Sequence, residues 1–317
     1  MLEVSVTEEE RTTGRLGPHS ARTAALLLHT AGYVVLRDAL PHDLVARARA
    51  QFDDILRDCM ESRDGEAWYQ VSARHRAVFW ERGARWRVFP KLRPPLSDVQ
   101  LLANPLVMPL LEELLGSGFR CKFVSSDTCV RGSVIQAPHR ELGAGGAREA
   151  PAYIVNVPLS RNTRRNGPLE VWPNGSHLWS AEVLQSHGLA DDIQDGENPA
   201  LLEFSRRLPS ERLLVESGSL LIRNPGMLHR GTPNRTRRPR SMLTVCYLRR
   251  DYDYDYGAAD YNLDSELFAD LDPAVQSLFP RPEGAHTPLP VKVKTAAPSR
   301  QPRAWLRRIS QVGRSFS

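Results

Sequence analysis

The chain has 317 residues, of which 41% are hydrophobic and 25% are charged. This balance is typical of a folded globular protein, and the length allows a large core that needs neither disulfides nor a structural metal. We find no apolar run of the roughly 18 residues that a membrane-spanning helix needs and no signal-peptide core, so we expect a cytoplasmic protein that is not inserted in a membrane.

The formal net charge of +5 is concentrated at one end of the chain. Residues 281–317 contain eight Lys or Arg and one Glu, a charge of +7, which leaves −2 for the preceding 280 residues. A nucleic-acid-binding surface needs a basic patch on the folded body. We therefore expect no nucleic-acid partner.

The N-terminal part predicts helix, strand and helix. Residues 1–20 are polar and aperiodic, which indicates a flexible terminus. Ala21 to Thr30 predicts a short helix, and Tyr33 to Leu36 has the β-branched character of a buried strand. After Pro41, apolar residues recur at helical spacing and predict an amphipathic helix: Leu44, Ala48, Phe52, Ile55 and Leu56.

Residues 62–95 are rich in Arg and Trp and show no clear period. We interpret them as a loop with short helices over a pocket. The alternative is a surface excursion whose aromatic side chains close the edge of the core. Their arginines, together with one in the segment 143–150, allow an anionic or carrier-linked substrate: Arg82, Arg85, Arg87 and Arg148.

From Phe119 onward, short β-type runs alternate with Gly, Pro and Asn. The runs are Phe119 to Val130, Tyr153 to Leu159, Leu169 to Trp172, Leu213 to Val215, Leu220 to Arg223 and Met242 to Leu248. Helical material from about Ala181 to Arg207 interrupts them once. This pattern predicts a mainly β fold with flanking helices, whose core is a double-stranded β-helix or jelly roll.

We predict a single domain over residues 21–280, followed by a basic, Pro-rich tail over residues 281–317. The alternation of Asp and Tyr from Asp251 to Tyr256 permits either a strand or an exposed loop. The tail is compatible with disorder, with docking on the body or with contact to an acidic partner. Gly143 to Gly146 predicts a flexible lid over the site.

The strongest chemical signal is the segment Gln136-Ala-Pro-His139-Arg-Glu141, followed 88 residues later by His229. If this segment is extended, His139 and Glu141 point to the same side and can share a metal. His229 ends an apolar run just before turn residues, where a strand meets a loop. Two His and one carboxylate leave three positions open on a metal, the arrangement of non-haem Fe(II) oxygenases.

Arg240 lies eleven residues after His229, at the start of a predicted strand. A hairpin would return its guanidinium toward the metal, where the planar group can hold the far carboxylate of a dicarboxylate. The alternative is a solvated arginine in a turn, since several others are close by: Arg230, Arg235, Arg237 and Arg238. The spacing favours Arg240.

Taken in order, these motifs resemble the phytanoyl-CoA dioxygenase-like branch of the Fe(II)/2-oxoglutarate-dependent oxygenases. The resemblance extends from Tyr33 to about Tyr247. It rests on Gly32-Tyr33-Val-Val-Leu-Arg with Leu40-Pro41, on Asn166-Gly-Pro-Leu with Gly175-Ser-His177, and on His229-Arg-Gly-Thr-Pro-Asn234 with Arg240. The segment Gln136-x-x-His139-Arg is similar to a subgroup that tailors specialised metabolites.

The resemblance implies that His139, Glu141 and His229 hold Fe(II) and that 2-oxoglutarate chelates this iron. Arg240 would then hold the distal carboxylate of 2-oxoglutarate. Gln136 would help to hold the same molecule, although an amide that pairs strands is an equal alternative. We expect His177 to be structural, bonding within its turn.

One residue departs from the family pattern, which usually has Asp where this chain has Glu141. The added methylene moves the carboxylate by about 1.5 Å. A retained carboxylate argues against a halogenase, in which a small residue leaves the position open for halide.

We therefore expect an enzyme that uses O2 to oxidise, most simply to hydroxylate, a C–H bond of a small specialised metabolite, with release of succinate and CO2. One alternative is a jelly-roll protein that binds a small molecule without turnover. Another is a module that binds an acidic partner through the basic tail. The oligomeric state is left open, and a homodimer is compatible with the sequence.

Overall fold

The computed structural model describes residues 1–65, 69–141, 151–187, 199–252 and 261–280. The strands are β1 (Glu3–Ser5), β2 (Tyr33–Arg37), β3 (Gln70–Val71), β4 (Val78–Arg82), β5 (Arg85–Phe89), β6 (Arg120–Cys129), β7 (Ala152–Pro158), β8 (Leu169–Val171), β9 (Glu211–Arg212), β10 (Leu220–Arg223), β11 (His229–Gly231) and β12 (Arg240–Leu248). The helices are α1 (Glu8–Thr13), α2 (Pro18–Ala31), α3 (His42–Glu61), α4 (Val99–Leu102), α5 (Met108–Leu115), α6 (Ala181–Ser186), α7 (Pro199–Arg207), α8 (Ser265–Ala269) and α9 (Pro273–Gln276).

Two sheets form the core. The large sheet has nine strands in the order β1-β2-β10-β7-β12-β6-β5-β4-β3, and the small sheet has three in the order β11-β8-β9. Pairing is antiparallel throughout except between β1 and β2. The mixed architecture with a large antiparallel sheet confirms the predicted jelly-roll fold class.

The two faces of the large sheet have different partners, as β2 illustrates. Val34 and Leu36 belong to the main hydrophobic core, which also contains side chains of α2 and α3. Tyr33 and Val35 point to the opposite face and pack with Leu169 and Val171 of the small sheet. Because side chains alternate along the strand, β2 has an outer face toward the helices and an inner face toward the small sheet.

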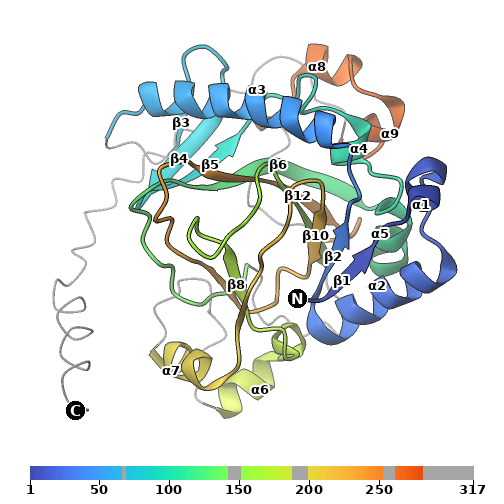
Figure 1. Cartoon of the computed structure of the whole chain (residues 1–317), viewed down its shortest axis with the longest axis vertical. Coiled ribbons are helices and arrows are strands. Elements are labelled where there is room, and N and C mark those ends of the chain that lie inside the picture. Colours follow the sequence, from blue (N-terminus) through green and yellow to red (C-terminus); the bar gives the residue numbers. More distant parts are fainter. Residues whose placement is uncertain (66–68, 142–150, 188–198, 253–260, 281–317) are drawn as a thin grey trace.

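Helices cover the outer face of the large sheet. In Figure 1, α3 runs across the part of the sheet formed by β4, β5 and β6, while α2 lies beside β1 and β2. The predicted stripe on α3 is buried, including Leu44, Ala48, Phe52 and Ile55. These helices leave the inner face free for polar chemistry.

The N-terminus differs from the prediction of a flexible segment over residues 1–20. Residues Glu3–Ser5 pair in parallel with β2, and a capping box between Thr7 and Glu10 begins α1. The buried side chains of Val4 and Val6 join the main core. The segment is too short to show a period, and so its burial was not apparent from sequence.

Residues 62–95 also differ from the prediction, because they contain β3, β4 and β5 rather than a loop with short helices. In β5, Trp86 and Val88 point to the main core. The alternate residues Arg85, Arg87 and Phe89 point to the inner face. An inner face that carries arginines does not show the usual apolar signal of a buried strand, and this explains the failed prediction.

The other predicted strands agree with the structure, except that Leu213 to Val215 forms no strand, although Leu213 and Val215 are buried. The described helices α6 and α7 lie within the predicted helical stretch. The proposed lid at residues 143–146, most of the Asp-Tyr alternation and the tail at residues 281–317 lie outside the described residues. Within the described residues, the apolar length needed for a membrane-spanning helix is not reached by any helix.

Candidate iron and 2-oxoglutarate site

The backbone brings the two predicted histidine ligands together. The segment before residue 142 runs antiparallel to β11, with His139 N–H donating to the His229 carbonyl at 2.9 Å and His229 N–H donating back at 3.0 Å. Residues paired in this way carry their side chains on the same face. The two imidazole rings are accordingly only 4.5 Å apart between centroids.

Each imidazole is oriented by its own backbone. His139 Nδ1 lies 2.9 Å from the Ala137 carbonyl oxygen, and His229 Nδ1 lies 2.7 Å from that of Met227. A carbonyl oxygen can only accept, so each Nδ1 must carry the hydrogen. The Nε2 atom of each ring therefore keeps its lone pair, which is the form that binds a metal.

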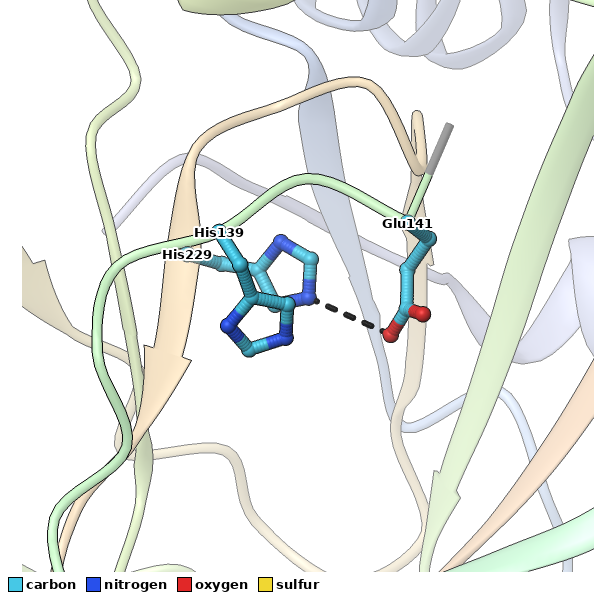
Figure 2. Close-up of side chains that lie close together, drawn as sticks. All are labelled: His139, Glu141 and His229. Atoms are coloured by element: carbon cyan, nitrogen blue, oxygen red, sulfur yellow. Dashed lines mark hydrogen bonds and ion pairs between the residues drawn. The ribbon is translucent and has the colours of Figure 1, made fainter. Parts of the chain in front are cut away.

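Glu141 completes a compact cluster, drawn in Figure 2. Its backbone N–H donates to the Pro225 carbonyl at 2.9 Å, which fixes the segment after His139. Arg140 points away and bonds the backbone of Gly226, so His139 and Glu141 share one side as predicted. The ligand atoms of His139, Glu141 and His229 all lie within 4.8 Å of one another.

The chemistry of this cluster fits a metal ion. His229 Nε2 lies 3.4 Å from Glu141 Oε1. With the hydrogen on Nδ1, both of these atoms are lone-pair donors and repel each other unless a cation lies between them. Two imidazole nitrogens and one carboxylate oxygen also match the donor set of a non-haem iron site.

The electrostatics keep His229 and Glu141 in their metal-binding forms. Burial and the charge of Arg223 lower the pKa of His229 to about 4, so its imidazole is neutral at pH 7. Burial opposes ionisation of Glu141, but neighbouring positive charge, including that of Arg87, keeps the pKa of Glu141 well below its ordinary value, so this side chain is a carboxylate at pH 7.

Arg240 is fully buried on the inner face of β12. Its Nε donates to the Gly167 carbonyl at 3.0 Å, and Nη1 donates to the Asp127 carbonyl at 2.9 Å and lies 3.3 Å from the Asp127 carboxylate. Nη2 is buried and has no partner among the described residues. Arg237 and Arg238 are exposed, so burial distinguishes Arg240 from its neighbours as the spacing did.

A second arginine, Arg85, lies beside Arg240. Both are direct register partners of Cys129, one from β5 and one from β12, so the two guanidinium groups share the inner face. Arg85 is 5% exposed and donates to the carbonyls of Val134 and Thr232. The sequence predicted Arg85 in a loop over the pocket, as one of the arginines that allow an anionic or carrier-linked substrate, and did not indicate its position beside Arg240.

Gln136 lies against β11. Its side-chain oxygen accepts from Gly231 N–H at 2.8 Å. Gly231 has no room for a side chain, because an added Cβ would lie 2.5 Å from Gln136 Oε1 and even closer to Arg85 Nη1. Gln136, Arg85 and Gly231 are therefore packed in direct contact.

The remaining four residues that the sequence analysis named do not belong to the cluster of His139, Glu141 and His229. Arg87 lies on the inner face over the Phe123 ring, whereas Arg82 is exposed and Arg148 lies outside the described residues. His177 is not part of the cluster, and its Nε2 bonds the His29 carbonyl on α2 rather than its own turn.

Comparison with known proteins agrees with this geometry. The family model described as phytanoyl-CoA dioxygenase (PhyH) matches residues 28–242, about two thirds of the chain. Solved structures with the same fold include the "non-heme alpha ketoglutarate dependent epimerase SnoN from nogalamycin biosynthesis". It is 21% identical, with a TM-score of 0.54, and the match covers 73% of this chain and 84% of that one.

Two further structures have a similar fold. The "non-heme alpha ketoglutarate dependent carbocyclase SnoK from nogalamycin biosynthesis" is 16% identical, with a TM-score of 0.55 and coverage of 86% of this chain and 94% of that one. EctD from S. alaskensis with bound Fe is 17% identical, with a TM-score of 0.52 and coverage of 85% and 86%. The family match and the assembled cluster together show that this chain belongs to the phytanoyl-CoA dioxygenase (PhyH) family of iron- and 2-oxoglutarate-dependent oxygenases.

Proposed function

We propose that this enzyme oxidises a C–H bond of a small specialised metabolite, with hydroxylation as the outcome and with succinate and CO2 as co-products. The observation that supports it most directly is the pair of lone-pair donors, His229 Nε2 and Glu141 Oε1, facing each other at 3.4 Å. His139, Glu141 and His229 would hold Fe(II). When bound, iron with 2-oxoglutarate and O2 supplies the oxidising power for the substrate C–H bond.

The role of the protein is to hold the reactants in position. Arg240 would bind the distal carboxylate of 2-oxoglutarate, because its buried Nη2 has no other partner among the described residues. Gln136 would assist through its amide nitrogen, since its oxygen is already bonded to Gly231. Arg85 lies beside Arg240 and adds a second positive charge there, so that the two guanidinium groups outweigh the single negative charge of Asp127.

The same ligand set can support more than one type of oxidation. Two proteins with this fold, SnoN and SnoK, are described as an epimerase and a carbocyclase, so the same architecture serves reactions other than hydroxylation in those proteins. Desaturation, ring formation and endoperoxidation would use the same three ligands. A carrier-linked substrate, a homodimer and a cytoplasmic location stay predictions.

The complete donor set argues against a binding protein without turnover. Glu141 replaces the usual Asp, yet it reaches the two histidines within the same 4.8 Å cluster. The third interpretation depends on the tail, which lies outside the described residues.

Product detection tests the proposed function. The purified chain is loaded anaerobically with Fe(II), mixed with 2-oxoglutarate and pools of candidate metabolites, and exposed to O2. Mass spectrometry then follows succinate and any substrate that gains one oxygen. Succinate with a product of +16 mass units supports hydroxylation, a loss of two hydrogens points to desaturation or ring formation, and the absence of iron-dependent succinate contradicts the enzyme.

A further inference from the structure

A further buried arginine, Arg223, lies beside the candidate iron ligands on the inner face of the large sheet. Arg223 ends β10, is 5% exposed, and places Nη2 3.8 Å from Glu141 Oε1. Its Nη1 is buried and has no partner among the described residues. No motif pointed to this arginine, and the roles assigned above to the iron and 2-oxoglutarate ligands do not use it.

Arg223 is held in place by neighbouring strands. Its Nε lies 3.2 Å from Asn156 Oδ1 on β7. The amide nitrogen of Asn156 in turn donates to Thr244 Oγ1 on β12 at 2.9 Å. This buried row fixes both the amide and the guanidinium, so Arg223 is a pre-oriented cation rather than a mobile surface side chain.

The charge of Arg223 is only partly compensated among the described residues. Its ion pair there is with Glu141, at 3.8 Å, and its buried Nη1 has no hydrogen-bond partner in the same part of the chain. A buried guanidinium without full pairing is costly.

Glu141 does not fully satisfy Arg223. The separation of 3.8 Å is beyond hydrogen-bond distance, and a carboxylate bound to iron would give much of its charge to the metal. The guanidinium keeps two terminal nitrogens on one edge, which match the two oxygens of a carboxylate or phosphate.

We propose that Arg223 binds an oxyanion of the oxidised substrate, a carboxylate or phosphate, and so places the substrate beside Glu141. This inference rests on the proposed function, because it assigns a substrate class to the same site. Arg223 would be a specificity-determining residue, and Asn156 a residue that positions it. Neutral analogues of the substrate would leave Arg223 unpaired and would bind poorly.

The test uses small anions as probes and does not require the natural substrate. Wild-type protein is first shown to retain Fe(II) and to bind 2-oxoglutarate, which scores the proposed function separately. With saturating 2-oxoglutarate under anaerobic conditions, the NMR relaxation of acetate, inorganic phosphate and neutral acetamide is then measured, since bound Fe(II) relaxes only nuclei that come close to it.

We expect saturable relaxation of acetate or of phosphate, but not of acetamide. The Arg223→Gln variant should bind the anion at least ten-fold more weakly at unchanged iron content and 2-oxoglutarate affinity, and Arg223→Lys should recover part of the binding. Arg206→Gln, which changes an exposed arginine on α7, is the matched control and should resemble wild type.

The proposal would be overturned by equal anion binding by wild type and Arg223→Gln, by no anion binding by wild type, or by acetamide binding as strong as acetate binding. A loss of iron in Arg223→Gln would instead assign Arg223 to holding Glu141 and would also contradict it. If wild type fails to retain iron, calorimetric titration of the metal-free protein with the same anions scores Arg223 independently of the proposed function.

Discussion

Arg85 and Arg240 are register partners of the same residue, Cys129, from the strands on its two sides. Two buried guanidinium groups therefore lie together on the inner face, with the carboxylate of Asp127 beside them. Burial opposes ionisation of Asp127, but Arg240 and Arg85 hold its pKa below the ordinary value. The pair of arginines retains one net positive charge at the place where we put the distal carboxylate of 2-oxoglutarate.

Replacing Arg240 tests this placement. Truncating one partner of a buried charge pair costs about 2–5 kcal/mol, so Arg240→Ala should raise the KM for 2-oxoglutarate about 30-fold or more. The KM for the oxidised substrate should change far less. Exposed Arg237→Ala is the control, and a larger effect there would show that the wrong arginine had been assigned. Arg240→Lys keeps the charge if the alanine variant does not fold.

Gly231→Ala tests the contact between Gln136 and Arg85. The backbone of Gly231 needs no left-handed conformation, but a Cβ there would overlap Gln136 Oε1 and Arg85 Nη1. We expect a folded protein with weaker 2-oxoglutarate binding, because both side chains must move. Gly65→Ala, where an added Cβ meets nothing within 4 Å, is the matched control. Unchanged 2-oxoglutarate affinity in Gly231→Ala would mean that Gln136 and Arg85 do not contribute to 2-oxoglutarate binding.

The sequence predicted those elements whose buried residues are apolar and those site residues that follow a regular spacing along the chain. β2 and α3 follow apolar patterns and were predicted within a few residues. His139 and Glu141 were found because extended backbone puts residues two apart on one side. β5 was not predicted, because the residues on its inner face include Arg85 and Arg87. They alternate with Trp86 and Val88, which are buried against the helices in the main core.

Arg223 illustrates a different limit. It follows the apolar residues Leu220 to Ile222 in the same strand, and an isolated arginine at a strand end usually indicates solvent. Only the three-dimensional pairing of β10 with β7 shows that it is buried beside Asn156 and near Glu141. The position of Arg223 directly after an apolar run could have indicated a buried charge. The sequence alone does not show which group this charge faces.

Removing either imidazole should remove the metal. His139→Ala and His229→Ala each leave two protein ligands, so both iron content and 2-oxoglutarate-dependent succinate formation should fall to background. Iron is measured by mass spectrometry of the purified protein. His187→Ala, at an exposed histidine, is the control and should retain iron. Wild-type iron content in either ligand variant would refute the ligand assignment.

The length of the Glu141 side chain determines how far its carboxylate reaches toward the two histidines. Glu141→Ala should lose oxygenation, whereas Glu141→Asp should keep reduced but measurable turnover, because the carboxylate is retained about 1.5 Å further back. Succinate and product formation are measured together. An Asp variant that gains turnover from an inert wild type would mean that the natural protein only binds its ligand. Normal turnover in Glu141→Ala would show that the Glu141 carboxylate is not an iron ligand.

The pKa of His229 predicts how the metal-free protein responds to acid. Its ordinary value of 6.5 falls to about 4 in the folded state. Between these values the unfolded chain takes up a proton that the folded chain does not, so stability falls as the pH falls from 6.5 toward 4. At pH 5 this one group lowers the free energy of unfolding by about 2 kcal/mol relative to pH 8.

Urea unfolding of the metal-free protein at pH 8 and pH 5 measures this loss. His229→Gln cannot take up the proton, so the difference between the two pH values should shrink by about 2 kcal/mol in that variant. His187→Gln, at an exposed site, should keep the full difference. Glu141 and Asp127 also have lowered pKa values, but their effect grows mainly below pH 5, under the ordinary values of 4.5 and 3.8. An identical pH dependence in wild type and His229→Gln would mean that His229 is not held neutral by burial beside Arg223.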